Sequence, residues 1–100
     1  MAAKFRPDPN STKNEMRWRL RDPADFERFW SALYYKPLRA REYIALPDGV
    51  RAITGKLWSG RVTVQALRFN RGKWTEARAR QWWQRHAHQF EKTWRVKDWK

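Results

Sequence analysis

The chain has 100 residues and no cysteine, so one domain is expected, and disulfides and thiolate metal sites are excluded. It contains 23 Lys and Arg against 10 Asp and Glu, a net charge of +13 at pH 7. A field of that sign attracts polyanions over long range. The composition therefore predicts a partner that is nucleic acid, an acidic membrane surface or an acidic protein. The alternative is an arginine-biased composition that only solvates the surface.

Residues 1–14 are polar and contain two prolines, which predicts a flexible basic arm carrying Lys4, Arg6 and Lys13. Residues 15–100 are expected to form a single domain. A domain this small buries only about 60% of its unfolded surface, so its 8 Trp, 5 Phe and 3 Tyr must supply much of the core. No apolar run is long enough to span a membrane and the N-terminus lacks an apolar secretory segment. An intracellular location is expected.

The first predicted element is a strand over residues 16–21, where apolar residues alternate strictly with arginines. One face would be buried, and the other would be a row of arginines. The buried set is Met16, Trp18 and Leu20, and the outer set is Arg17, Arg19 and Arg21.

Residues 22–37 are predicted to form a helix, with Asp22 as the N-cap and Pro23 in the first turn. Pro37 would end it, because the residue before a proline avoids the helical region. The apolar residues recur at i, i+3, i+4 and i+7, which is typical of a core-facing stripe. They are Phe26, Phe29, Trp30 and Leu33.

Three further strands are predicted over residues 42–46, 50–58 and 61–69, separated by turns at Pro47–Gly49 and Ser59–Gly60. A third turn follows at Asn70–Gly72. The last strand has an ambiguous face, because Val64 and Leu67 differ in parity. Either both sides of this strand are covered, or a bulge shifts its register.

The last element is a helix that begins at Thr75, a good N-cap. The tryptophans and arginines of this segment diverge around the helix: Trp82 and Trp83 are expected to face the sheet, and Arg78 and Arg85 to face outward. The tail after Phe90 would either extend the helix or fray. The predicted order is β-α-β-β-β-α, an α+β domain in which an antiparallel sheet of three to four strands packs on two helices.

Cations alternate with apolar and aromatic residues along the predicted strands and turns. Phosphate binding needs cations spaced along a surface, and base reading needs a rigid element that fits a groove. These residues form the candidate nucleic-acid-binding set: Arg17, Arg19, Arg51, Arg61, Arg68, Arg71, Lys73 and Arg78. The alternative is that they only solvate the polar face of the sheet.

Neither a metal site nor a catalytic set is indicated. His86 and His88 are two residues apart on a predicted helix, where they diverge by about 200° and cannot chelate one ion. There is no nucleophile elbow and no glycine-rich phosphate loop. The sequence predicts a protein that is not an enzyme and has no cofactor. A basic amphipathic last helix could lie on a membrane, but its apolar face is needed for the core, so no membrane partner is expected.

Residues 49–86 resemble a short module of tailed-phage open reading frames, in which a VQ…RF strand and a turn precede KWT…A…W…H. The resemblance implies a viral or mobile-element origin. That module occurs near head-maturation proteins, but a protease region is lacking here, so no catalytic residue is transferred. The matching positions are Val64, Gln65, Arg68, Phe69, Lys73, Trp74, Thr75, Ala79, Trp82 or Trp83, and His86.

Two similarities of element order are broader. From Pro23 to Phe90 the predicted order is similar to that of double-stranded-RNA-binding domains, although their lysine pair at the start of the last helix is absent. Three strands plus a helix also resemble plant-type and integrase-arm sheet readers of DNA. Fold similarity alone does not fix function.

We expect a non-enzymatic nucleic-acid-binding protein that uses a basic sheet face and its turns, with duplex DNA favoured over RNA. The alternative is a small viral protein-protein interaction factor that docks on an acidic host or virion protein. Charge alone does not separate them, because an acidic protein surface imitates phosphate.

Overall fold

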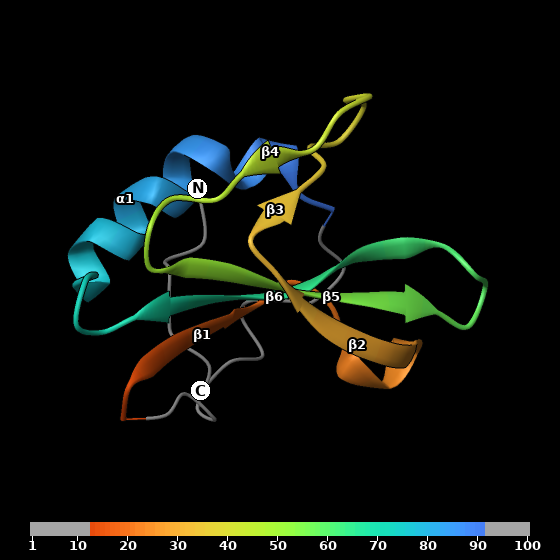
Figure 1. Cartoon of the computed structure of the whole chain (residues 1–100), viewed down its shortest axis with the longest axis horizontal. Coiled ribbons are helices and arrows are strands. Elements are labelled where there is room, and N and C mark those ends of the chain that lie inside the picture. The colour runs from red at the N-terminus through yellow and green to blue at the C-terminus, as the bar shows by residue number, and fades with distance from the viewer. Residues whose placement is uncertain (1–12, 92–100) are drawn as a thin grey trace.

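The computed structural model describes residues 13–91, which form one antiparallel sheet, a short two-stranded ribbon and one α-helix (Figure 1). The main sheet has the order β1-β6-β5-β2, and the ribbon is β3-β4. The predicted α+β class with an antiparallel sheet is confirmed, but the helix predicted over residues 22–37 is wrong, so the sheet packs on one α-helix rather than two. The strands are β1 (Glu15–Arg19), β2 (Phe26–Ala32), β3 (Tyr34–Tyr35), β4 (Ile44–Ala45), β5 (Val50–Leu57) and β6 (Val62–Asn70); the helix is α1 (Glu76–His86), followed by a 3-10 turn, Ala87–Gln89.

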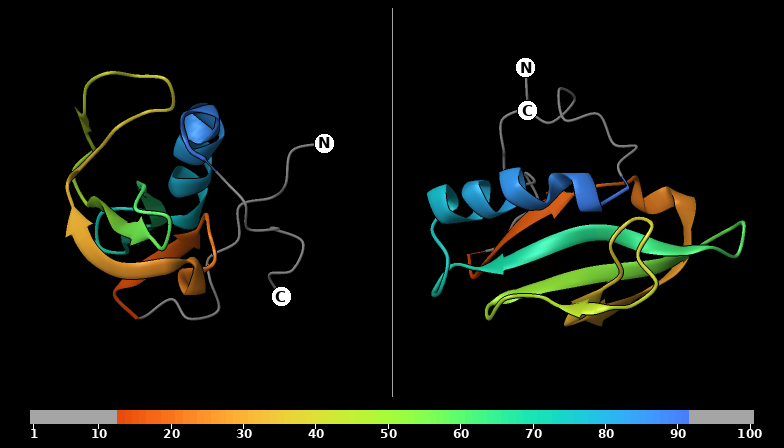
Figure 2. Two further views of the ribbon diagram at one scale, coloured as in Figure 1. Left: turned by 90° about the vertical axis from the view of Figure 1, so that its right-hand side faces the viewer. Right: turned by 90° about the horizontal axis from the view of Figure 1, so that it is seen from above.

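The sheet curls around α1, which covers its inner face (Figure 2, left). The β3–β4 ribbon stands on the same side as α1. The outer face of the sheet is therefore convex. Most of residues 1–14 and the whole tail from residue 92 lie outside the described residues, so the expectations of a basic arm and a C-terminal extension remain predictions.

The core lies between β1, β6, β5 and α1. Met16, Trp18 and Leu20 are almost completely buried, as the alternation of this segment predicts. The Trp18 ring meets the Trp83 ring edge-on at 5.5 Å between centroids, which joins the sheet to the helix. Strand β1 ends at Arg19, two residues earlier than predicted, because the chain turns away after Leu20 to reach β2.

The predicted helix over residues 22–37 is a 3-10 turn (Pro23–Asp25) followed by strands β2 and β3. Asp22 does cap this turn, accepting a hydrogen bond from the Ala24 amide at 2.9 Å. The chain then pairs with β5, where Gly55 leaves room for the Phe26 ring: a Cβ at Gly55 would lie 2.4 Å from the ring. Pairing of β2 with β5 therefore outweighs the helical spacing of the apolar residues. The first helix of the element order shared with double-stranded-RNA-binding domains is absent from this segment.

The ambiguous parity of β6 is resolved by a bulge at Gln65. Thr54 of β5 pairs with Val64, whereas Ile53 pairs with Ala66, so Gln65 is the extra residue. The bulge switches parity, which lets Val64 and Leu67 lie on the same, inner side of the sheet. The predicted strand over residues 42–46 shrinks to the two residues of β4.

Helix α1 begins where it is predicted, but it ends at His86, and the 3-10 turn Ala87–Gln89 separates it from Phe90. Thr75 is its N-cap and accepts a hydrogen bond from the Arg78 amide at 3.1 Å. Trp83 is buried and Trp82 half-buried against the core, while Arg78 and Arg85 are exposed. The tryptophans and arginines therefore separate around the helix, as predicted.

Replacing Trp83 with Ala should lower the free energy of unfolding by about 3–5 kcal/mol, because it removes a large buried ring and leaves a cavity. Arg85→Ala, two residues along on the exposed side, should change it by less than about 0.5 kcal/mol. Thermal and urea unfolding followed by circular dichroism measure both. A Trp83→Ala variant as stable as the parent chain would contradict the packing of α1 on the sheet.

Candidate nucleic-acid interface

Three arginines from three neighbouring strands lie side by side on the outer face of the sheet. Arg17 of β1 is opposite Arg68 of β6, and Arg68 is opposite Arg51 of β5. Residues paired across antiparallel strands project to the same face, about 5 Å from strand to strand. Arg19 lies two residues further along β1, opposite Ala66. The arginine face is defined here as Arg17, Arg19, Arg51 and Arg68 together with Glu15.

Glu15 partly neutralises this face. Its carboxylate accepts two hydrogen bonds from Arg51, at 3.1 and 3.0 Å, and lies 3.7 Å from an Arg68 nitrogen. Burial lowers the pKa of Arg68, and the positive charge of Arg17 lowers it further, while Glu15 acts in the opposite direction. Four arginines against one glutamate leave three net positive charges on the arginine face.

A second group of cations lies in the turn between β6 and α1 and in the first turn of α1, at the end of the sheet where Asn70 pairs with Glu15. The Arg78 guanidinium lies 4.7 Å from the centroid of the Trp74 ring and donates to the Lys73 carbonyl at 2.8 Å. The turn cluster is defined as Arg71, Lys73 and Arg78.

Lys73 is tied to the neighbouring Pro47–Gly49 turn. Its ammonium donates to the Asp48 carboxylate at 2.9 Å, and this hydrogen bond lowers the pKa of Asp48. The Trp74 indole donates to the Asp48 carbonyl at 2.8 Å. These contacts hold the turn cluster against the end of the sheet that carries the row of three arginines.

Arg61 does not belong to either group. It lies at the opposite end of β6, where its guanidinium donates to the Glu91 carboxylate at 2.7 Å. Nine strand residues separate it from Arg71, roughly 30 Å of extended chain. The predicted set of eight cations is therefore not one surface: seven lie at the arginine face and the turn cluster, and Arg61 takes part in another feature.

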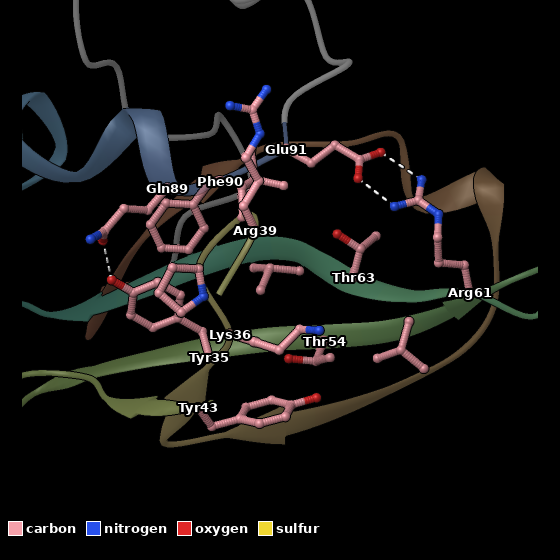
Figure 3. Close-up of a pocket in the computed structure, with 14 residues that line it drawn as sticks. Tyr35, Lys36, Arg39, Tyr43, Thr54, Arg61, Thr63, Gln89, Phe90 and Glu91 are labelled. Atoms are coloured by element: carbon pink, nitrogen blue, oxygen red, sulfur yellow. Dashed lines mark hydrogen bonds and ion pairs between the residues drawn. The ribbon is translucent and has the colours of Figure 1, made fainter. Parts of the chain in front are cut away.

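That feature is a pocket of about 240 Å³ between the β3–β4 ribbon and the segment after α1 (Figure 3). Lys36, Arg39 and Tyr43 come from the ribbon and its loop, Arg61 from the β5–β6 turn, and Glu91 from beyond α1. No pattern in the sequence predicts this pocket. Its lining comes from five separate stretches of chain, so no contiguous motif marks it.

The pocket wall is held by two contacts across the chain. The Tyr35 hydroxyl donates to Gln89, and the Tyr35 ring stacks on Phe90 at 4.6 Å. Glu91 also accepts a hydrogen bond from Arg21 at 2.7 Å. Burial raises the pKa of Tyr35, so this hydroxyl stays protonated as a donor.

No group of three or more His, Cys, Asp or Glu side chains suited to a metal ion occurs within residues 13–91. His86 is half-buried and its Nδ1 lies 2.7 Å from the Trp82 carbonyl oxygen, whereas His88 is exposed. Over the same residues, no helix is both long and apolar enough to cross a membrane.

Comparison with known proteins found no matching family model, no similar curated protein and no similar solved structure. The resemblance to a tailed-phage module therefore remains a prediction from the sequence, and a functional assignment depends on the physical chemistry of the surfaces described above.

Acid should weaken the contact between Arg61 and Glu91. The hydrogen bond from Arg61 holds the pKa of Glu91 below its usual value, with desolvation opposing it. The folded pKa is depressed, so Glu91 stabilises the fold above its unfolded pKa of about 4.5, and this stability is lost as pH falls through the folded pKa. Glu91→Gln should therefore lose less melting temperature than the parent chain between about pH 5 and pH 3.

The matched control is Glu42→Gln, which removes an exposed carboxylate from the β3–β4 loop. Thermal melts at a series of pH values compare the three chains. Identical acid profiles for Glu91→Gln and Glu42→Gln would show that the ion pair does not contribute to stability.

Proposed function

We propose that this protein binds nucleic acid, duplex DNA in preference to RNA, through the arginine face and the turn cluster. The observation that supports this most is the single row formed by Arg17, Arg68 and Arg51 across three strands. Arginine presents a planar fork of donors that matches phosphate oxygens and the guanine edge, which an isolated lysine does not.

The dimensions of the row suit the major groove of duplex DNA. Three strands spaced by about 5 Å span roughly 10 Å from Arg17 to Arg51. The major groove is about 12 Å wide and admits a β-ribbon. The convex outer face (Figure 2, left) is the shape that enters a groove. Double-stranded RNA has a narrow, deep major groove that side chains do not reach, which favours DNA.

The side chains of the row favour a duplex over a single strand. Single-strand binders offer exposed aromatic rings on which successive bases stack. The row of arginines contains no ring. Phe26 and Phe29 of β2 lie beyond it, in the strand that pairs with the Gly55 end of β5. The turn cluster adds cations at the end of the row, where they would contact the phosphates that flank the groove.

A second candidate function is docking on an acidic protein. The observation that favours it is an apolar surface on the edge strand β2 and the β3–β4 ribbon. Its exposed side chains are Phe29, Trp30, Leu33, Tyr34 and Ile44. Large exposed apolar side chains gathered on neighbouring elements are found at interaction surfaces. Docking through these apolar side chains would not depend on the arginine face.

Binding to random duplex DNA should be strongly salt-dependent. The arginine face and the turn cluster together supply seven cations, so about 5–7 phosphate contacts give a slope of log K against log salt near −4.5 to −6.3. Fluorescence anisotropy with a labelled duplex between about 50 and 200 mM salt measures this slope. A flat response, or no binding at micromolar protein, would reject the proposal in favour of protein docking. Duplex RNA and single-stranded DNA of equal length should bind less tightly.

The double variant R17Q/R68Q should lose about two phosphate or base contacts and reduce the magnitude of the salt slope by about 1.8. The control R41Q/R85Q removes the same charge from exposed positions on the β3–β4 loop and α1, away from the arginine face. It should lower affinity only through the general field. Equal losses in the two double variants would show that net charge, rather than the arginine row, determines binding.

Glu15→Gln should tighten duplex binding at low salt and lower stability. It removes the carboxylate shared by Arg51 and Arg68, so three like charges face each other without it. Added salt should restore the stability by screening that repulsion. Glu42→Gln changes the net charge equally and serves as the control. Unchanged affinity in Glu15→Gln would place the bound phosphates elsewhere on the surface.

A further inference from the structure

The pocket beneath the β3–β4 ribbon is separate from the arginine face. It lies on the inner side of the sheet, where Val64, Thr54 and Phe90 contribute to its lining. The row of arginines lies on the outer side. A ligand of this pocket therefore need not compete with a duplex bound to the arginine face.

The rim of the pocket is cationic. Lys36 and Arg39 come from the ribbon loop, and Arg61 comes from the opposite rim. Arg61 is already paired with Glu91, as the two dashed contacts in Figure 3 show, so Lys36 and Arg39 are the two rim cations that form no ion pair within residues 13–91. Figure 3 shows the Lys36 side chain over the pocket beside Thr54 and Tyr43, whereas the Arg39 guanidinium points away from it. Lys36 is therefore the cation placed to bind an anion that carries one phosphate.

The pocket lining also contains an exposed aromatic ring and apolar side chains. The Tyr43 side chain is 61% exposed although it lines the pocket, and Figure 3 shows it on the same rim as Lys36. Val62 and Leu38 add apolar surface. An exposed ring beside a cation is the combination that holds a planar heterocycle by stacking and its phosphate by charge.

The loop that supplies these groups is fixed in place. The Leu38 amide donates to the Gln89 carbonyl at 2.9 Å, and the Ala40 amide donates to the Pro37 carbonyl at 3.0 Å. Within residues 13–91, Arg39 is the one non-glycine residue with a positive φ, at 65°. That conformation costs free energy for an arginine and persists where the surroundings determine it.

We propose that this pocket binds a nucleoside phosphate, with the base against Tyr43 and the phosphate at Lys36. The cavity volume of about 240 Å³ lies just below the usual range of ligand pockets, about 300–1,000 Å³, which suits at most one nucleotide and excludes a dinucleotide cofactor. The nucleotide is either free or the terminal nucleotide of a strand. Binding of a free nucleotide is independent of the nucleic-acid binding proposed above. Binding of a strand end rests on that proposed function and adds a second contact to the same nucleic acid.

Isothermal titration calorimetry and ¹H–¹⁵N NMR of the full chain test this with AMP, adenosine and inorganic phosphate. AMP should bind with a dissociation constant below about 1 mM and shift the amide signals of Thr63 and Gln89. Adenosine and phosphate should each bind at least about tenfold more weakly than AMP. Adenosine keeps only the stacking on Tyr43, and phosphate keeps only the contact with the cation. Equal binding of phosphate and AMP, or no AMP binding at all, overturns the proposal.

Matched variants locate the site. Tyr43→Ala should weaken AMP binding roughly 5- to 100-fold through lost stacking. Its control is Tyr34→Ala, a similarly exposed tyrosine of β3 that does not line the pocket. Lys36→Gln should also weaken AMP binding, whereas Arg41→Gln in the same loop should not. Equal effects of each variant and its control overturn the proposal.

Two further measurements separate the sources and the two proposals. A 5′-phosphorylated trinucleotide that displaces AMP far better than its 5′-hydroxyl form indicates a strand end, while displacement no better than by AMP itself indicates the free nucleotide. R17Q/R68Q should keep AMP binding unchanged. If R17Q/R68Q loses duplex binding but keeps AMP binding, the two sites are independent. Failure of one proposal then does not affect the other.

Discussion

The bulge at Gln65 is the constraint on which both surfaces of the sheet depend. Gln65 is buried, its carbonyl accepts the Leu20 amide at 2.9 Å, and its side-chain amide donates to the Arg21 carbonyl at 3.0 Å. The extra residue therefore also anchors the chain as it leaves β1. Because side chains alternate with period two, one inserted residue exchanges the two faces of β6 beyond it. Arg68 faces outward for this reason, while Leu67 and Phe69 enter the core.

The prediction from sequence succeeded where local pattern and burial agree. Alternation in β1 and the Thr75 cap of α1 each determine one structure, because the same residues satisfy propensity and core packing. It failed over residues 22–37, where aromatic residues at helical spacing are also good strand formers. The strand is favoured there by Gly55, 29 residues beyond Phe26, which leaves room for the Phe26 ring. As an edge strand, β2 also lacks the alternation of burial that would have identified it.

The candidate interface could be predicted only residue by residue. Arg17, Arg51 and Arg68 were expected on strands, but their alignment in one row depends on register, and register depends on the bulge. Arg61 looked equivalent in sequence, yet Glu91 pairs with it across the fold. The pocket gave no signal, because Tyr43, Arg61 and Glu91 meet only after three separate segments fold together.

Because the chain has no disulfides, the aromatic core must hold the helix on the sheet. The aromatic rings of the core are therefore placed on the inner face and the arginines on the outer face. The rings of Trp18, Phe69 and Trp83 are buried on the inner face of the sheet. Trp18 meets Trp83 edge-on, and Phe69 meets Trp74 edge-on. The outer face then has arginines whose stems are partly buried and whose charges are balanced only in part by Glu15. Burial lowers the pKa of Arg68, and the positive charges of Arg17 and Arg51 lower it further by repulsion. The proposed binding of a polyanion would relieve that repulsion, so part of the electrostatic cost of folding would become a source of affinity.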